Sequence, residues 1–264
     1  MLSADLHFCV LIPVYNNPEG LLRTIFSIHY TKENYLVVVV DDGSRDPVTE
    51  EQLQATGVPF QLLRLPQNGG ITGALNTGLR WIQQHTTARY VARLDCSDTC
   101  HPERFLRQVA FLDRHPEVGL LGTWCTFESE DGSHSYLYKT PVEHEAIIKE
   151  MHGRNVFIHP TVMFRTGLLE RVGLYPYEYP HAEDYALFWS MVRAGRSAIL
   201  GEDLVTCALT EGGISMSNRK AQLKSRLRVV QRFGNDHGRQ ILSFFKMKLL
   251  LFVPQRLILW WRSS

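Results

Sequence analysis

Residues 36–44 read LVVVVDDGS, an apolar run that ends in two acids, a glycine and a serine. A leucine and four successive valines leave no polar side, and this composition is typical of a strand buried on both faces of a sheet. Such a strand belongs to a sheet that carries helices on both sides. The stretch therefore predicts an α/β fold, with Asp41 and Asp42 where the chain leaves the sheet.

Elements of the same two kinds alternate along the first 125 residues. Strand patterns occupy residues 7–13, 60–65, 90–94 and 118–124, and helical patterns occupy 48–55, 71–84, 102–114 and a segment that starts at Pro18 after Asn17. This alternation predicts a doubly wound, mostly parallel sheet. Farther along, the chain is expected to form a helix at 141–151, a strand at 161–164 and a helix at 181–195.

Length and charge divide the chain into a body and a tail. A chain of 264 residues can hold one large α/β domain, expected at 1–218, and a helical segment at 219–264. The tail holds eleven Lys or Arg and one acid, so it carries a charge of +10, while the body carries −9. A basic tail on an acidic body predicts an anionic partner surface.

Cysteine usage indicates a reducing compartment. The chain has five cysteines, an odd number, and no secretory signal precedes the first strand pattern, which favours the cytoplasm. Cys96, Cys100 and His101 suggest zinc, but the C-x3-C spacing lacks a second ligand pair of the usual form. Small buried thiols are the preferred interpretation.

Chemically useful side chains follow three of the predicted strands. Tyr15 follows the first, Asp41 and Asp42 follow the second, and Asp95 and Asp98 follow the fourth. Ligands of doubly wound sheets bind at the carboxyl ends of the strands. An aromatic face can stack on a base, and carboxylates can accept hydrogen bonds or hold a divalent ion. One acidic turn could merely cap a helix, but two on neighbouring strands favour a binding site.

Two further positions are candidates. Asp184 stands at the start of the helix expected at 181–195, where it could favour the helix N-terminus or act as a general base. His159 precedes a proline, and a lone histidine in such a place is more often structural than catalytic.

Taken together, these motifs resemble those of family-2 glycosyltransferases with the GT-A fold, especially bacterial surface-polysaccharide enzymes. The matching pieces are IPVYN at 12–16, VDDGS at 40–44, NGG at 68–70 with ALNTG at 74–78, RLDCSD at 93–98, HPTVMFR at 159–165 and EDY at 183–185. Each motif alone is weak evidence for the family, but the order and spacing of all the motifs over residues 7–215 make the resemblance specific. The tail lies outside the resemblance.

The resemblance implies a reaction and a set of residue roles. The enzyme would transfer a sugar, with inversion, from a nucleotide-diphosphate sugar, by preference a UDP-sugar, to a lipid-linked or growing glycan acceptor. The implied catalytic base is Asp184. The implied nucleotide-sugar site consists of Pro13 and Tyr15 at the base, Asp41 or Asp42 at the base edge, Asp95 at the ribose and diphosphate, and Asn76 and Glu183 nearby.

The chain departs from the family at the metal site. The family usually reads D-x-D-D, but the third letter here is Ser97, and Thr210 replaces a frequent histidine. Serine and threonine are poor substitutes for a carboxylate and an imidazole. Asp95 and Asp98, or Glu211, would have to compensate. A divalent ion, Mg²⁺ or Mn²⁺, is still expected to assist, because a leaving diphosphate needs cationic stabilisation.

Other functions are weighed against this interpretation. Loss of metal ligands would suit a catalytically weakened sugar-nucleotide-binding subunit of a membrane assembly, but Asp184 argues for an active enzyme. A Rossmann oxidoreductase would need G-x-G-x-x-G after the first strand, and residues 69–73 fit neither the pattern nor the place. A nucleotidyltransferase would want a glycine-rich basic loop there, which Asn16-Asn17-Pro18 is not. The tail is too apolar for a nucleic-acid arm.

Residues 243–261 of the tail mix Phe, Leu, Ile and Trp with basic side chains and contain no acid. A membrane-spanning helix needs about 20 mostly apolar residues. Lys246, Lys248 and Arg256 interrupt this stretch, and Pro254 would bend it. An amphipathic helix on an anionic membrane surface fits better. We therefore expect a cytoplasmic protein, peripheral on the inner face of the plasma membrane; the alternative is a helix packed on the body or on a second subunit.

Overall fold

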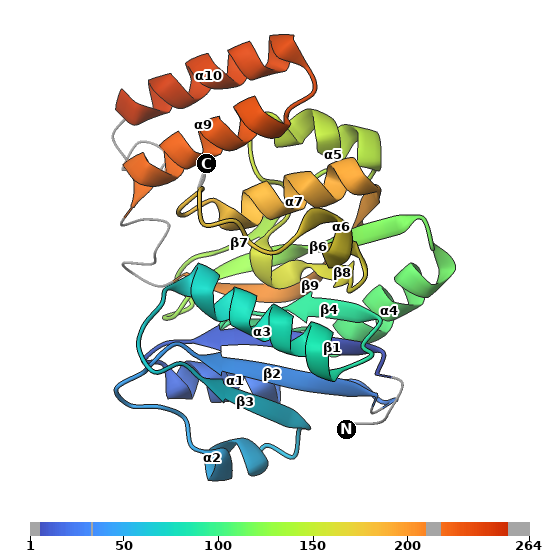
Figure 1. The fold of residues 1–264 in the computed structure, drawn as a ribbon, viewed down its shortest axis with the longest axis vertical. Coiled ribbons are helices and arrows are strands. Elements are labelled where there is room, and N and C mark those ends of the chain that lie inside the picture. Colours follow the sequence, from blue (N-terminus) through green and yellow to red (C-terminus); the bar gives the residue numbers. More distant parts are fainter. Residues whose placement is uncertain (1–5, 33, 210–217, 253–264) are drawn as a thin grey trace.

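The computed structural model describes residues 6–32, 34–209 and 218–252, and its strands form one sheet (Figure 1). The order across the sheet is β3-β2-β1-β4-β8-β6-β9-β5, with β7 paired to β6. The strands are β1 (Phe8–Val14), β2 (Tyr35–Asp41), β3 (Phe60–Arg64), β4 (Tyr90–Arg93), β5 (Thr99–Cys100), β6 (Val118–Ser129), β7 (Ser135–Tyr138), β8 (Met163–Arg165) and β9 (Arg196–Leu209). β1 to β4 are parallel, and β8 pairs antiparallel with β4 and β6. The predicted α/β fold with a mostly parallel sheet is confirmed.

The described helices include each predicted one within a few residues, and two short ones, at 159–161 and 168–172, that the sequence patterns do not predict. They are α1 (Pro18–Phe26), α2 (Glu50–Gln54), α3 (Ile71–His85), α4 (Arg104–Arg114), α5 (His144–Met151), the 3₁₀ turn η1 (His159–Thr161), α6 (Leu168–Val172), α7 (Glu183–Ala194), α9 (Arg219–Phe233) and α10 (His237–Phe252). The start of α1 is as expected: the Asn17 side chain accepts a hydrogen bond from Gly20 N–H at 3.0 Å, and Pro18 opens the helix.

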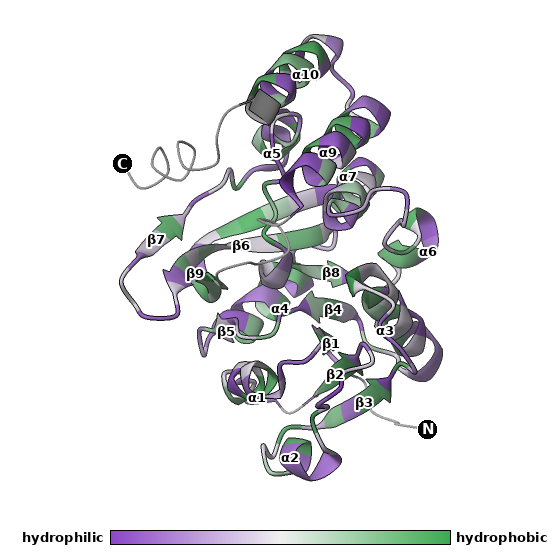
Figure 2. Cartoon of the chain, turned by 90° about the vertical axis from the view of Figure 1, so that its left-hand side faces the viewer, coloured by the Kyte–Doolittle hydropathy of each residue, from purple (hydrophilic) through white to green (hydrophobic). Residues whose placement is uncertain are grey.

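Both faces of the sheet are covered, as the valine run predicts. Along β2, Val38 and Val40 face a core layer shared with α3, while Val37 and Val39 face the opposite layer with α1 and α4. In the turned view, α1 and α4 lie on one side of these strands and α3 lies on the other (Figure 2). The alternation is the period of two of a strand, here apolar on both sides.

Close packing of α3 on the sheet depends on Gly78. A Cβ atom at this position would lie 2.2 Å from Leu11 Cδ1 and 3.0 Å from Val40 Cγ2. The missing side chain lets the helix backbone approach β1 and β2. This approach fixes where the N-terminal end of α3 meets the ends of those strands.

One long strand escapes the sequence analysis. β9 runs parallel to β6 over fourteen residues, and β5 pairs with its far part. Its pairing with β6 shifts register between Thr123 and Thr126, opposite a segment that contains Gly201 and two acids. Bulges interrupt the alternation of apolar residues, so the sequence pattern is weak here.

Within residues 218–252, the tail forms two helices that pack in succession on the body. α9 packs on α7 and α10 packs on α9, which leaves α10 outermost (Figure 1). Leu223, Val229 and Val230 of α9 and Met247 of α10 are buried. Among the described helices, none combines the length and the apolar character that crossing a bilayer requires. The apolar helix expected from residue 243 starts earlier, at His237, and residues 253–264 lie outside the described part.

Candidate functional site

The loops that follow β1 and β2 are tied into one rim. Asn16, with φ at 50°, donates its backbone N–H to Ser44 Oγ at 2.8 Å, and its side-chain oxygen accepts from Arg45 N–H at 2.8 Å. Tyr15 precedes Asn16 and is 46% exposed, whereas Pro13 is buried inside β1. Of the two residues predicted to line a base pocket, Tyr15 therefore presents the larger surface to a ligand.

Asp41 and Asp42 shape the turn after β2. Asp41 Oδ1 accepts a hydrogen bond from Ser44 N–H at 2.9 Å, and Asp42 Oδ1 accepts one from Gly69 N–H at 2.8 Å. Gly43, which follows the two acids, has φ at 71°, and a Cβ there would lie 2.5 Å from the backbone of Gln67. The acid pair thus holds the β2 turn against the loop before α3. Asp41 and Asp42 are only 2% and 4% exposed, and their role in base recognition stays a prediction.

Asp95 is held at the end of β4 by a buried cation. Arg93, fully buried, forms an ion pair with the Asp95 carboxylate and also donates to the backbone oxygen of Leu94 at 3.0 Å. Burial of Asp95 would raise its pKa, but the Arg93 guanidinium holds that pKa below its ordinary value. Asp95 is therefore anionic at neutral pH, and about a third of its side chain (34%) is exposed.

A hydrogen-bonded chain leads from Arg93 to α3. Arg93 Nε donates to His159 Nε2 at 3.2 Å, and the same nitrogen lies 2.8 Å from the Tyr175 hydroxyl. Burial, with the charge of Arg93, lowers the pKa of His159 to about 3, so its ring is neutral. A ring with so low a pKa is a poor base at neutral pH, and a structural role stays the prediction for His159.

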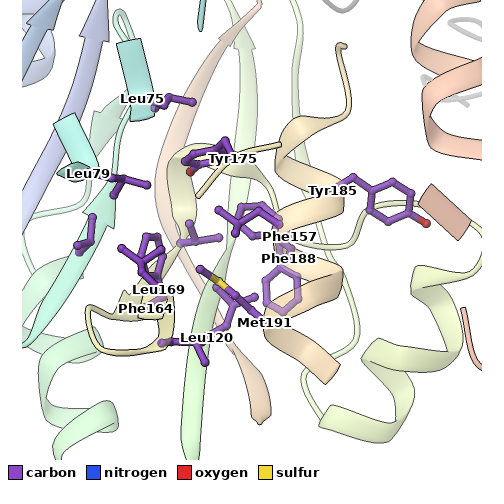
Figure 3. Packing of buried hydrophobic residues seen from close by; sticks show 14 of the residues in the cluster. Leu75, Leu79, Leu120, Phe157, Phe164, Leu169, Tyr175, Tyr185, Phe188 and Met191 are labelled. Atoms are coloured by element: carbon purple, nitrogen blue, oxygen red, sulfur yellow. The ribbon is translucent and has the colours of Figure 1, made fainter. Parts of the chain in front are cut away.

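The side-chain amide of Asn76 is hydrogen-bonded to the backbone of Tyr175. Its Nδ2 donates to Tyr175 O at 2.9 Å, and its Oδ1 accepts from Tyr175 N–H at 2.9 Å. Figure 3 shows Tyr175 between Leu75 of α3 and the side chains of α7. This arrangement makes Asn76 a positioning residue for the Tyr175 segment. It gives no support to the predicted direct contact with a nucleotide sugar.

Two adjacent acids begin α7. Asp184 Oδ2 accepts a hydrogen bond from Asn155 Nδ2 at 2.9 Å. Glu183 is buried, and its Oε2 has no partner among the described residues. Burial and the neighbouring Glu183 charge raise the pKa of Asp184 to about 7, and burial also raises the pKa of Glu183. A carboxylate with a pKa near 7 is suited to accept a proton at neutral pH.

The described residues do not by themselves form a divalent-cation site. Asp98 is buried, accepts Ala208 N–H at 2.8 Å, and has a pKa raised well above its ordinary value by burial and by Asp95. Ser97 Oγ accepts from Asn17 Nδ2 at 3.1 Å. No cluster of three or more His, Cys, Asp or Glu able to hold a metal occurs in the described part of the chain. Thr210 and Glu211 lie outside it.

Three residues at the site have no role that the sequence patterns assign, although Arg93 stands at the start of the RLDCSD motif. Arg93, Asn155 and Tyr175 hold Asp95, Asp184 and Asn76 respectively. Only Arg93 carries a signal that could be read beforehand: a lone arginine in an otherwise apolar strand, two residues before Asp95 and therefore on the same face. A buried arginine needs an anion, and the nearest one is Asp95.

Comparison with known proteins identifies relatives over most of the chain. Residues 9–173 match the sequence model described as Glycosyl transferase family 2. The amylovoran biosynthesis glycosyltransferase AmsE of Erwinia amylovora is 33% identical over 71% of this chain and 70% of its own. The UDP-Gal:alpha-D-GlcNAc-diphosphoundecaprenol beta-1,3-galactosyltransferase of Escherichia coli is also 33% identical, over 71% of this chain and 68% of its own.

Solved structures agree on the fold. The mannosyltransferase PcManGT from Pyrobaculum calidifontis, in complex with GDP-Man and Mn²⁺, superposes with a TM-score of 0.66. The superposition covers 93% of this chain and 70% of the PcManGT chain, and the two sequences are 20% identical. The similarity therefore concerns the arrangement of strands and helices.

Proposed function

The chain belongs to glycosyl transferase family 2, and from that premise we propose that it is an inverting transferase that moves a sugar from UDP onto a lipid-linked or growing glycan. The observation that carries the proposal is Asp184: an acid with a pKa of about 7, next to Glu183 and electrostatically coupled to Asp95. The UDP donor and the lipid-linked acceptor are those in the name of the Escherichia coli relative. The name of AmsE favours surface-polysaccharide synthesis as the setting.

The proposed reaction is a single displacement. The acceptor hydroxyl oxygen attacks the anomeric carbon, the bond from that carbon to the diphosphate oxygen breaks, and UDP departs with the electron pair. Asp184 takes the hydroxyl proton as the new bond forms, so the anomeric configuration inverts. Tyr15, Asp41 and Asp42 bind the base, and Asp95 and Glu183 bind the ribose and donor sugar. Most of the catalysis then comes from positioning and from the proton transfer.

The nucleotide pocket is tested by Asp42→Ala. If Asp42 accepts a hydrogen bond from the base, the variant should bind UDP more weakly by about 1.5–3 kcal/mol, as expected for a charge-assisted hydrogen bond. Calorimetric titration with UDP, GDP and UDP-sugars measures this and also tests the choice of nucleotide.

Asp42→Asn is the matched control for the loop, because its amide oxygen can still accept Gly69 N–H. Both variants should weaken UDP binding, whereas only Asp42→Ala should lower the melting temperature. Unchanged UDP affinity in both would remove Asp42 from the pocket.

The metal is tested by Ser97→Asp. With Ser97 in place of an acid, we expect Mg²⁺ or Mn²⁺ to bind weakly, and restoring the carboxylate beside Asp95 should tighten Mn²⁺ binding about tenfold or more. Ser97 has φ at 77°, a conformation that Asp tolerates better than most residues. Titration of Mn²⁺ in the presence of UDP provides the measurement, with Ser97→Asn as the uncharged control. Full transfer by the wild type in excess chelator would contradict an assisting ion.

The proposed location is the inner face of the plasma membrane, where a lipid-linked acceptor would be met. α10 supports it, because Ile241, Leu242, Phe245 and Leu249 on one side of this outermost helix are 59–69% exposed. A weakened, sugar-nucleotide-binding subunit remains the alternative, and donor hydrolysis by the purified protein separates the two.

A further inference from the structure

Arg226 of α9 makes neither a hydrogen bond nor an ion pair within the part of the chain that the structure describes. Its Nε is shielded from solvent. Arg226 as a whole is half-buried, so part of the residue is open to solvent. A buried guanidinium nitrogen without a hydrogen bond costs free energy unless a bound group satisfies it.

The position of Arg226 is set by the packing of α9 on α7. Its Cζ lies 5.9 Å from the centroid of the Tyr185 ring. Tyr185 is buried and donates its hydroxyl to Met151 O, so the ring is a fixed support. Figure 3 shows Tyr185 pointing from α7 away from the cluster around Phe157 and Met191. Since Tyr185 directly follows Asp184, the guanidinium lies by the first turn of α7.

Arg226 lies near Asp184 and Tyr185 rather than at the strand ends. The cations that act on Asp95 at the strand ends are Arg93 and Arg104, whereas Arg226 acts on Asp184 and Tyr185. A donor diphosphate at Asp95 already has buried arginines nearby. α9, in turn, lies between α7 and α10 (Figure 1), the helix proposed to meet the lipid surface.

We propose that Arg226 binds the diphosphate of a lipid-linked acceptor and so holds the acceptor hydroxyl at Asp184. The proposal rests on the proposed function, because it assumes that Asp184 faces the acceptor. A guanidinium matches phosphate oxygens with two parallel N–H donors, which a lysine cannot reproduce. The donor diphosphate is the other source of the same chemistry, and the experiment separates the two.

Binding is measured with a probe that needs no knowledge of the sugar. Farnesyl diphosphate is titrated by calorimetry into full-length protein that has been saturated with UDP, and farnesol serves as the uncharged counterpart. The wild type should bind the diphosphate more tightly than the alcohol. Arg226→Gln should weaken diphosphate binding about tenfold to a hundredfold, leave farnesol unchanged, and leave UDP affinity unchanged. Arg226→Lys should fall between the two.

Lys224→Gln is the matched control, because Lys224 is exposed on the same helix and its loss removes the same charge. It should change farnesyl diphosphate binding less than twofold. Equal binding of diphosphate and alcohol by the wild type, or equal diphosphate binding by wild type and Arg226→Gln, would overturn the proposal. Weaker UDP binding with unchanged farnesyl diphosphate binding would assign Arg226 to the donor and also overturn it. UDP binding by the wild type tests the proposed donor separately.

Discussion

The Asp184→Asn variant is expected to lose transfer activity by a factor of about 10²–10⁴, the usual contribution of a general base. Asparagine keeps an oxygen that can accept from Asn155 Nδ2, so the start of α7 should keep its structure. It cannot take the acceptor proton. Because the base acts on the acceptor, affinity for UDP should change little. Turnover with a radiolabelled UDP-sugar and calorimetry with UDP provide the two measurements.

Asn155→Ala is the matched comparison for Asp184→Asn. It removes the hydrogen bond to Asp184 but leaves the carboxylate, so it should reduce the rate far less. Wild-type turnover by Asp184→Asn would remove Asp184 from the mechanism. A parallel fall in UDP affinity would assign the residue to the donor site.

The same residue predicts the pH dependence of the wild type. Asp184 must be ionised to act as a base, and its pKa is about 7, so kcat/KM should rise with pH through that value. The stability effect has the opposite sign. The pKa of Asp184 is higher in the folded state than the ordinary 3.8 of the unfolded chain, so the folded state binds the proton more tightly. Ionisation of Asp184 therefore lowers the stability of the fold as the pH rises from about 4 through 7. Asp184→Asn should therefore melt no lower than the wild type above neutral pH.

Apolar patterns predicted the part of the fold that depends on burial. The runs at β1, β2 and β4 are apolar because both faces of the sheet are covered there. β9 shows where this reasoning stops. Its bulged pairing with β6 and its edge pairing with β5 leave the alternation irregular, so the pattern alone does not separate it from a loop.

The sequence likewise predicts some features of the candidate site and not others. Strand ends and the start of α7 follow from secondary structure, so the positions of Asp42, Asp95 and Asp184 could be predicted from the sequence. Their partners could not. Asn155 reaches Asp184 from 29 residues away, and Asn76 meets the backbone of Tyr175 across 99 residues. The spacing of a polar residue in the sequence does not indicate which distant residue it will contact. Only the folded structure therefore shows which acids are already hydrogen-bonded and which are available to a ligand.

The outer face of α10 is expected to hold the protein on anionic membranes. At 100° per residue, Ile241, Leu242, Phe245 and Leu249 fall within one third of the helix circumference. Lys246 and Lys248 lie on either side of this stripe and are exposed. The opposite side carries the buried Ser243 and Met247, which face the body. The apolar stripe thus stays exposed after α10 has packed on the body. Basic residues flank it on both sides, as in helices that lie at a membrane interface.

Phe245→Ser combined with Leu249→Ser should therefore release the protein from liposomes that contain anionic lipid. Inserting the two side chains is worth about 3–6 kcal/mol if both leave water completely, so partitioning should fall at least about a hundredfold. Co-sedimentation at low salt provides the measurement, and calorimetry with UDP should show an unchanged nucleotide site. Packing of α10 should survive, because both residues are exposed, at 65% and 66%.

A matched control replaces two exposed apolar residues elsewhere, Phe26→Ser with Leu106→Ser, which are 59% and 41% exposed on α1 and α4. If insertion of α10 is specific, this control should sediment like the wild type.

The basic residues beside the stripe predict a dependence on salt. Raising the salt concentration should weaken binding, because each Lys or Arg near the surface contributes about 1 kcal/mol by attraction to anionic headgroups. A wild type that fails to sediment at low salt, or that sediments equally with neutral and anionic lipid, would contradict the membrane-bound arrangement. A change from dimer to monomer in the Phe245 and Leu249 variant would instead identify the stripe as an interface with a second copy of the chain.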